Sequence, residues 1–382
     1  MGERQQTNLG DIDFFRGIAA FVVAAFHTRE YTWVGIREFW KLEGLHATPN
    51  TILGYLTFPL IWGSIGVPIF FVLSGYCIHR SQAFARVRGG SFQLSPTNFL
   101  MRRFFRIYPV LAGALFLTLL CDLTSRQYFP NSYKLGDTGI DTFLVNLFSL
   151  QGLAGRTYGS NGALWTLSIE VQFYALYPLL SLTMGRVGNY STLLILIVFN
   201  VVSYFALQRR GYLLFSSYYV SWYLGVLVAE NEAAGRFSKY LESAGHRTAL
   251  YGFSLGGLCA GCALYFLDGY VAFQVWAIAF AGLLFVMRKR PLSMRGRVAN
   301  FFRRLGSFSF SIYIIHVPIV VLIGSIFFNS VKQVSVAPFC AALVAAVICA
   351  YAFSFVFERP GLTLSRMLKS TPRLVTQARP AD

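Results

Sequence analysis

The feature that most constrains this chain is a series of apolar stretches, each long enough to cross a lipid bilayer. A bilayer core about 30 Å thick needs roughly 20 mainly apolar residues per helix. The 382 residues are 55% hydrophobic and 13% charged, more apolar than a water-soluble fold of this length requires. The sequence therefore predicts an all-α, polytopic transmembrane helical bundle of about ten spans, at residues 12–28, 59–79, 104–121, 165–184, 192–207, 212–229, 249–267, 270–287, 306–328 and 335–356.

The basic residues indicate how these spans are oriented. The formal net charge is +17, and Lys and Arg gather at residues 80–103, 288–304 and 359–379. With ten spans these three segments lie on one face, which the positive-inside rule assigns to the cytoplasm. Both termini are then cytoplasmic, and the loop around residues 122–163 lies outside. The charge is explained by orientation, so we predict no nucleic-acid partner.

Several local features qualify this topology. Residues 51–78 are too long for one simple span, and Gly63, Gly66 and Pro68 predict a broken helix start preceded by an interfacial segment. Residues 139–150 are apolar but too short to cross, so we interpret them as re-entrant or interfacial. The first stretch lacks a small-residue cleavage site and is interpreted as a retained span. We expect one membrane domain over residues 1–360 and a short basic cytoplasmic tail over 361–382.

The cysteines do not predict a metal or redox site. Cys259 and Cys262 form a C-x-x-C pattern, but they lie in an apolar span rich in glycine. Small residues there allow close helix packing, and the pattern has no polar partners that would hold a metal. We therefore predict no metal.

Ionisable residues within spans are costly, and they are functional candidates for that reason. The first span carries Asp13, Arg16 and His27. Eleven helical steps return Arg16 and His27 to nearly the same face, about 16 Å apart along the axis. His27 can exchange a proton near neutral pH, as acyl transfer requires. The simpler alternatives are a boundary ion pair of Asp13 with Arg16 and a histidine at the outer interface.

Two further groups stand out. Glu170, in the fourth span, could orient a histidine, hold a sugar hydroxyl or form a structural bond between helices. Arg103 and Arg106 lie before the third span, with Arg102 beside them, and their forked guanidinium groups suit phosphates. Positive-inside anchoring alone is the alternative for these arginines.

The remaining histidines are less informative. His316, in the ninth span, is a second possible base or ligand, although a core histidine bonded to a backbone carbonyl is the more common arrangement. His46, His79 and His246 lie in loops or at span ends without convergent partners, and we assign them no role.

Six motifs occur in a fixed order along nearly the whole chain, from about residue 9 to about residue 360. They are Asp-x-x-Arg-Gly at 13–17 with His27, Phe-Phe-Val-Leu-Ser-Gly at 70–75, the arginine pair at 103 and 106, Trp-Thr-Leu-Ser-x-Glu-x-Gln-Phe-Tyr at 165–174, Ser-Ile-Tyr-x-x-His-x-Pro at 311–318 and Glu-Arg-Pro at 358–360. Together they resemble the acyltransferase 3 family, membrane proteins that transfer acyl groups, often acetyl, to glycans and related acceptors.

The resemblance implies an O-acyltransferase of the cell (inner or plasma) membrane, with acyl-CoA, most simply acetyl-CoA, as cytoplasmic donor and a hydroxyl of a glycan, polysaccharide or glycolipid as acceptor. It implies that His27 acts as general base or acyl carrier, and that Arg103 and Arg106 hold coenzyme A phosphates while Arg16 positions the donor. The catalytic residues would be His27, Glu170 and Asp13, and the substrate-binding residues Arg16, Arg103, Arg106, Trp165, Ser168, Gln172, Tyr174 and His316.

Other protein classes fit the same topology less well. A transporter of an anionic or glycoconjugate substrate also needs polar stripes through its helices, but no related halves are visible in the sequence. A membrane scaffold or sensor would not need His27 and Glu170 within spans. Some acyltransferase 3 proteins carry a hydrolase-like extracytoplasmic domain that the 382 residues lack, so we expect the chain to complete transfer itself or pass the acyl group to another protein.

Overall fold

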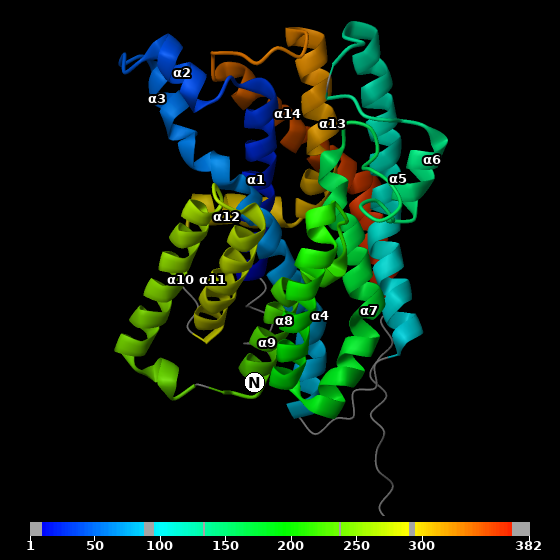
Figure 1. Ribbon diagram of the computed structural model, residues 1–382, viewed down its shortest axis with the longest axis vertical. Helices are drawn as coiled ribbons and strands as arrows, with labels where there is room; N and C mark the ends of the chain where they lie inside the picture. Colours follow the sequence, from blue (N-terminus) through cyan, green and yellow to red (C-terminus); the bar gives the residue numbers. More distant parts are fainter. Residues whose placement is uncertain (1–9, 88–94, 133, 237, 290–294, 369–382) are drawn as a thin grey trace, which may run out of the picture.

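The computed structural model describes residues 10–87, 95–132, 134–236, 238–289 and 295–368, and all regular elements within them are helices (Figure 1). This confirms the predicted all-helical class. Each predicted span overlaps a helix of 15 residues or more in the described residues. These helices are α1 (Gly10–Thr32), α4 (Gly66–Val87), α5 (Pro96–Tyr128), α7 (Trp165–Val187), α8 (Asn189–Ala206), α9 (Tyr219–Ala233), α10 (Ala244–Leu264), α11 (Gly269–Lys289), α13 (Ser309–Phe328) and α14 (Ala337–Phe353).

Six helical segments of the described chain are long and apolar enough to cross a bilayer. They are Pro49–Val87, Pro96–Tyr128, Asn189–Arg210, Gly269–Arg288, Ser309–Phe328 and Ala337–Met367. The chain is therefore a multi-pass membrane protein. The number of ten crossings and the side on which the termini lie stay predictions.

Shorter elements occupy the places where the sequence indicated irregular structure. The 3₁₀ helix η2 (Phe58–Ile65), which is non-helical at Trp62, precedes α4, so the second predicted span does begin with a break. The stretch at 139–150 forms only α6 (Ile140–Leu147). The other short elements are α2 (Ile36–Glu43), α3 (Pro49–Leu56), η3 (Gly162–Leu164), η4 (Gln208–Arg210), η5 (Phe215–Ser217), η6 (Tyr240–Glu242), α12 (Arg297–Gly306), the π-helical η7 (Ser354–Glu358) and α15 (Arg359–Met367).

The predicted tail over 361–382 is only partly described. It begins inside α15, and residues 369–382 lie outside the described residues. The division between membrane domain and tail stays a prediction.

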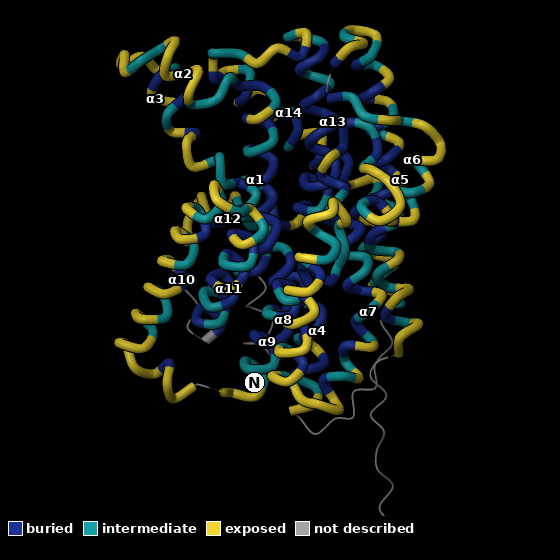
Figure 2. Tube along the Cα trace, viewed as in Figure 1, coloured by how far each residue is buried: buried dark blue, intermediate teal, exposed yellow. Residues whose placement is uncertain are grey.

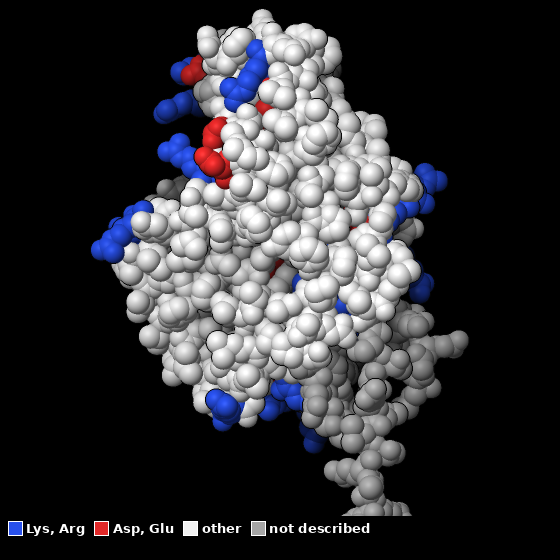
Figure 3. Space-filling view, turned by 90° about the vertical axis from the view of Figure 1, so that its right-hand side faces the viewer, with Lys and Arg blue, Asp and Glu red and all other residues white. Residues whose placement is uncertain are grey.

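The helices pack into one bundle with an apolar exterior. α4 packs against α9, α10 against α11, and α1 against α4, α12 and α13. Buried residues run along inner helices such as α1 and α13, whereas α10 is mostly exposed or partly exposed (Figure 2). Figure 3 shows a face that is largely uncharged, with charged side chains mainly toward its margins. This distribution is typical of a protein whose middle section is surrounded by lipid.

Two pairs of glycines allow helices to approach to backbone contact. On α4 and α9, a Cβ atom at Gly75 would meet the Trp222 carbonyl oxygen, and one at Gly225 would meet the Val72 carbonyl oxygen. On α1 and α12, Gly17 lies against the Phe302 carbonyl and Gly306 against that of Asp13. Small residues at helix crossings permit this packing in membranes. The α1–α12 contact positions Asp13 and Arg16.

We expect Gly225→Ala to destabilise the protein by about 1–3 kcal/mol, because the new methyl group must displace the Val72 backbone. Gly252→Ala, on α10, is the matched control because a Cβ atom there meets open space. It should be neutral or stabilise by up to about 1 kcal/mol. Thermal unfolding in detergent measures both, and equal melting temperatures for the two variants would contradict the close α4–α9 packing.

Candidate active site

A cavity of about 490 Å³ lies among α1, α4, α5, α7, α13 and α15. It is lined by side chains from segments far apart in the sequence, so only the folded bundle creates it. Six of the predicted site residues line it, namely Asp13, Arg16, Arg103, Arg106, Glu170 and Tyr174.

The cavity carries more positive than negative side chains. Five arginines line it against three carboxylates, and the arginines come from α1, α5 and α15. They are Arg16, Arg102, Arg103, Arg106 and Arg366, and the carboxylates are Asp13, Glu170 and Glu358. Because low-dielectric walls concentrate the field of such a group, the cavity attracts anions.

The three arginines of α5 lie inside the helix and not in a loop before it. Ser95 caps α5 by accepting a hydrogen bond from the Asn98 N–H at 3.4 Å, and Pro96 occupies the first turn. The helix thus begins eight residues before the predicted span at 104–121. Spacings of three and four residues then bring Arg102, Arg103 and Arg106 to one side of the helix.

These guanidinium groups share the cavity with three carboxylates but form no direct ion pair with them among the described residues. Among the described residues, Arg102, Arg103 and Arg106 form no ion pair, and the Nε atoms of Arg102 and Arg103 are buried without a hydrogen-bond partner. The Arg103 guanidinium lies 5.4 Å from the centre of the Tyr174 ring. Buried donors without partners are costly, so this arrangement favours an anionic ligand.

Asp13 and Arg16 lie at the α1 wall of the cavity. Their charged atoms are 3.9 Å apart, and the Asp13 side chain is 41% exposed. The predicted boundary ion pair therefore exists, but it is long and leaves much of both groups facing the cavity. Their proposed roles remain compatible with this placement.

Glu170 is held by the helix opposite. It accepts hydrogen bonds from the Ser74 hydroxyl of α4 at 3.1 Å and from the Tyr174 hydroxyl. Ser74 in turn accepts from the indole N–H of Trp222 at 3.2 Å. Among the described residues no histidine bonds to Glu170, whereas the helix-to-helix bond is present; a role in holding a sugar hydroxyl stays a prediction. The carboxylate still lines the cavity.

Glu358 is a cavity residue to which the sequence analysis assigned no role. Its Oε2 atom accepts hydrogen bonds from the Ser311 backbone N–H at 3.0 Å and from the Ser311 hydroxyl at 2.5 Å. The signal was present, since both residues belong to motifs of the resemblance. Arg102 and Arg366 are further cavity residues that were given no individual role.

His27 and His316 lie outside the cavity lining and contact each other. The Nδ1 atom of His27 is 2.8 Å from the Nε2 atom of His316. His316 is fully buried, and its Nδ1 atom bonds the carbonyl oxygens of Ile312 and Tyr313, which confirms the backbone-bonded interpretation. The Tyr313 ring lines the cavity and lies 6.1 Å from the His316 ring. Tyr313 therefore lines the arginine cavity and also neighbours the histidine pair.

Three predicted binding residues are placed elsewhere. Trp165 packs against the Tyr218 ring at 5.7 Å, Ser168 donates to the Gln151 carbonyl at 2.9 Å, and Gln172 accepts from the Phe215 N–H at 3.0 Å. None of them lines the cavity. They brace the first turns of α7 against neighbouring segments, and their role in substrate binding stays a prediction.

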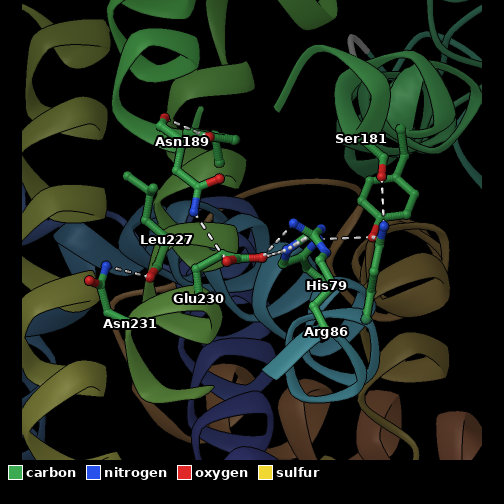
Figure 4. Close-up of polar contacts among 10 residues, drawn as sticks. His79, Arg86, Ser181, Asn189, Leu227, Glu230 and Asn231 are labelled. Carbon is green, nitrogen blue, oxygen red and sulfur yellow. Dashed lines mark hydrogen bonds and ion pairs between the residues drawn. The ribbon is translucent and has the colours of Figure 1, made fainter. Parts of the chain in front are cut away.

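A second polar cluster overturns the interpretation of His79 as a residue without convergent partners. Figure 4 shows its ring between helices α4, α7 and α9. His79 is fully buried, with Nε2 2.5 Å from a Glu230 carboxylate oxygen and Nδ1 2.9 Å from the Tyr177 hydroxyl. Glu230 also pairs with Arg86 at 3.3 Å and accepts from Asn189 at 3.1 Å.

Glu232, two residues later on α9, makes a similar set of contacts on another side of the helix. It accepts hydrogen bonds from the Tyr76 hydroxyl at 2.6 Å and from Arg288 at 3.0 Å, and it lies 3.7 Å from Arg80. The two carboxylates thus tie α4 and α11 to α9. Because their charges are compensated within the protein, we interpret this region as a structural clamp.

Replacing Glu230 by alanine should destabilise the protein by about 3–5 kcal/mol, because His79 and Arg86 would lose the carboxylate that compensates them. The exposed Glu242 provides a control on the same side of the bundle, and Glu242→Ala should change stability by less than about 0.5 kcal/mol. Thermal unfolding in detergent compares them. A Glu230→Ala protein as stable as the control would show that the cluster is not a clamp.

Comparison with known proteins identifies the family to which this architecture belongs. Residues 9–355 match the model of the acyltransferase 3 family, described as an acyltransferase domain. The match covers most of the chain, and the chain therefore belongs to this family.

A curated relative comes from Bacillus subtilis (strain 168) and is described as "Putative peptidoglycan O-acetyltransferase YrhL". It is 26% identical over 315 residues, which are 74% of this chain and 48% of the relative. The chain thus spans about half the length of the relative that it matches. No solved structure matches the chain. The described residues hold no group of three or more His, Cys, Asp or Glu side chains that could bind a metal ion.

Proposed function

We propose that this protein is an O-acyltransferase that moves an acyl group, most simply acetyl, from acyl-CoA to a hydroxyl of a glycan, polysaccharide or glycolipid. The observation that carries the proposal is the cavity of a chain of the acyltransferase 3 family, lined by Arg102, Arg103 and Arg106, of which Arg102 and Arg103 have buried Nε atoms without a hydrogen-bond partner. Coenzyme A presents several phosphate oxygens, and forked guanidinium groups bind phosphates well. The relative from B. subtilis, described as acting on peptidoglycan, supports a glycan acceptor.

The proposed topology has ten spans, with both termini on the cytoplasmic side of the cell (inner or plasma) membrane. The basic segments around α5 and α12 then face the cytoplasm, and the arginine cavity opens toward the donor. The loops that contain α2, α3 and α6 lie on the outer side, where a glycan acceptor is available.

The roles of the site residues follow from their places. Arg103 and Arg106 hold the phosphates, Arg16 with Asp13 positions the donor at the α1 wall, and Glu170 and Tyr174 complete the cavity. His27 lies about 16 Å further along α1 than Arg16. The pantetheine arm of coenzyme A separates the thioester from the phosphates, so the donor can bridge the two places. His27 then takes the proton of the acceptor hydroxyl as it attacks the thioester carbonyl.

The function is tested by incorporation of label from radiolabelled acetyl-CoA into glycans and glycolipids of sealed membrane vesicles. We expect incorporation in inside-out vesicles and little in right-side-out vesicles, because the donor binds from the cytoplasmic face. His27→Ala at equal expression should lower incorporation roughly 100-fold or more, to a measurable residual rate. Label that appears equally in both orientations would contradict the topology, and a wild-type rate in His27→Ala would contradict the role of the histidine.

Donor binding by the cavity is tested with Arg103→Ala. Loss of a charge-assisted hydrogen bond of about 1.5–3 kcal/mol should raise the KM for acetyl-CoA roughly 10- to 100-fold. Arg186→Ala is the matched control, because it removes an exposed arginine near the end of α7 that does not line the cavity. Steady-state kinetics in vesicles measure both, and an unchanged KM in Arg103→Ala would remove this arginine from the donor site.

A further inference from the structure

The contact between His27 and His316 indicates which ring nitrogen of each histidine carries a hydrogen. His27 is half-buried on α1 and His316 is fully buried on α13, 289 residues later in the chain. Their rings lie nearly parallel, at an interplanar angle of 17° with centroids 5.1 Å apart. His316 does not line the cavity, so a direct role in binding the donor does not account for its position.

The hydrogen bonds of His316 fix where its proton lies. Its Nδ1 atom is 3.0 Å from the Ile312 carbonyl oxygen and 2.8 Å from the Tyr313 carbonyl oxygen. A carbonyl oxygen only accepts, so Nδ1 must carry the hydrogen. A neutral imidazole has one N–H, which leaves the His316 Nε2 atom as an acceptor.

The proton of His27 follows from this assignment. The Nδ1 atom of His27 faces the accepting Nε2 atom of His316 at 2.8 Å, so it must carry the hydrogen and donate it. In the neutral ring the Nε2 atom of His27 then has no proton. The alternative is a cationic His316, but no carboxylate bonds to either ring in the described part of the chain, and a fully buried imidazolium without an anion is costly.

The surroundings hold His316 in this orientation. Pro318, two residues later, has no N–H, so the Ile314 carbonyl loses its usual partner within α13. Asn161 fills that place by donating to the Ile314 carbonyl at 2.9 Å, and it also donates to Thr118 of α5 at 3.1 Å. On the cavity side, the Tyr313 hydroxyl bonds that of Thr166 at 2.7 Å. The helix segment that carries His316 is therefore braced on two sides.

We propose that His316 is a positioning residue that sets the tautomer of His27, so that the unprotonated Nε2 atom of His27 serves as the base for acyl transfer. This rests on the proposed function. The acceptor oxygen forms a bond to the acyl carbon as the carbon–sulfur bond breaks. The hydroxyl proton moves to His27 Nε2, while His316 stabilises the resulting imidazolium by accepting from its Nδ1–H. The proton then passes to the departing coenzyme A thiolate.

The kinetic test uses two substitutions of His316 in vesicles with radiolabelled acetyl-CoA. His316→Phe keeps a ring but removes the acceptor, and we expect kcat to fall roughly 100-fold or more while the KM for acetyl-CoA stays unchanged. His316→Gln offers an amide oxygen near the position of Nε2 and should retain kcat within about tenfold of the wild type. A fall in both variants to the same level, or a change confined to KM, would overturn the proposal.

A double-mutant comparison separates positioning from independent effects. Because His316 acts through His27, the variant with both His27→Ala and His316→Phe should be no slower than His27→Ala alone. Losses that multiply would show that His316 acts without His27. Size-exclusion chromatography of each variant checks that the protein remains folded.

The tautomer itself is measured without activity, so that its failure is distinct from failure of the proposed function. The chain has five histidines, and ¹⁵N NMR of histidine-labelled protein in lipid identifies the His27 signals by their loss in His27→Ala. We expect a protonated Nδ1 and an unprotonated Nε2 for His27 in the wild type, and mixed tautomers in His316→Phe. A protonated Nε2 in the wild type would overturn the proposal, whereas the expected tautomer without label transfer would reject only the acyltransferase assignment.

Discussion

The rest of the structure depends on how the bundle compensates charges that are buried among apolar helices. An unpaired ionised group in such surroundings costs several kcal/mol, so each must find a partner, a ligand or water. Glu230 and Glu232 find partners in His79, Arg86 and Arg288. The α5 arginines that line the cavity form no direct ion pair among the described residues, and the Nε atoms of Arg102 and Arg103 have no hydrogen-bond partner. Whether the charged groups are paired within the protein, and not how many there are, distinguishes the structural clamp from the candidate binding site.

Features that depend on local periodicity could be predicted from the sequence. Runs of about 20 apolar residues specify helices wherever they occur, because every backbone polar group in lipid must bond within its own segment. Each of the ten predicted stretches accordingly overlaps a helix, and the break before α4 falls where Gly63, Gly66 and Pro68 indicated it. Arg16 and His27 share a continuous α1, as the eleven-residue spacing required. The Ser-Pro pair at 95–96 marks the start of α5.

Features that depend on contacts between distant helices could not be predicted in this way. His79 and Glu230 are 151 residues apart, and His27 and His316 are 289 residues apart. No spacing rule links residues across such distances, so His79 had no visible partner in the sequence. Similarly, residues of the motif at 165–174 lie in different places. Glu170 and Tyr174 line the cavity, whereas Ser168 donates a hydrogen bond to the Gln151 carbonyl. Which residues of one helix face the cavity depends on how its neighbours pack.

The separation of charge from the histidine pair has a physical rationale. The positive field of five neighbouring arginines would oppose the charge that a base gains when it takes a proton. A base placed among them would therefore stay neutral and accept a proton poorly. Tyr313 and Thr166 bond each other at the cavity wall, His27 and His316 do not line the cavity, and α1 places the Arg16 and His27 Cα atoms about 16 Å apart. In the proposed function an anionic donor is attracted by one region while proton transfer takes place in another, where His316 is the hydrogen-bond acceptor that the described residues offer to His27. A long donor with its charge at one end and its reactive carbonyl at the other is the substrate shape that such a division accommodates.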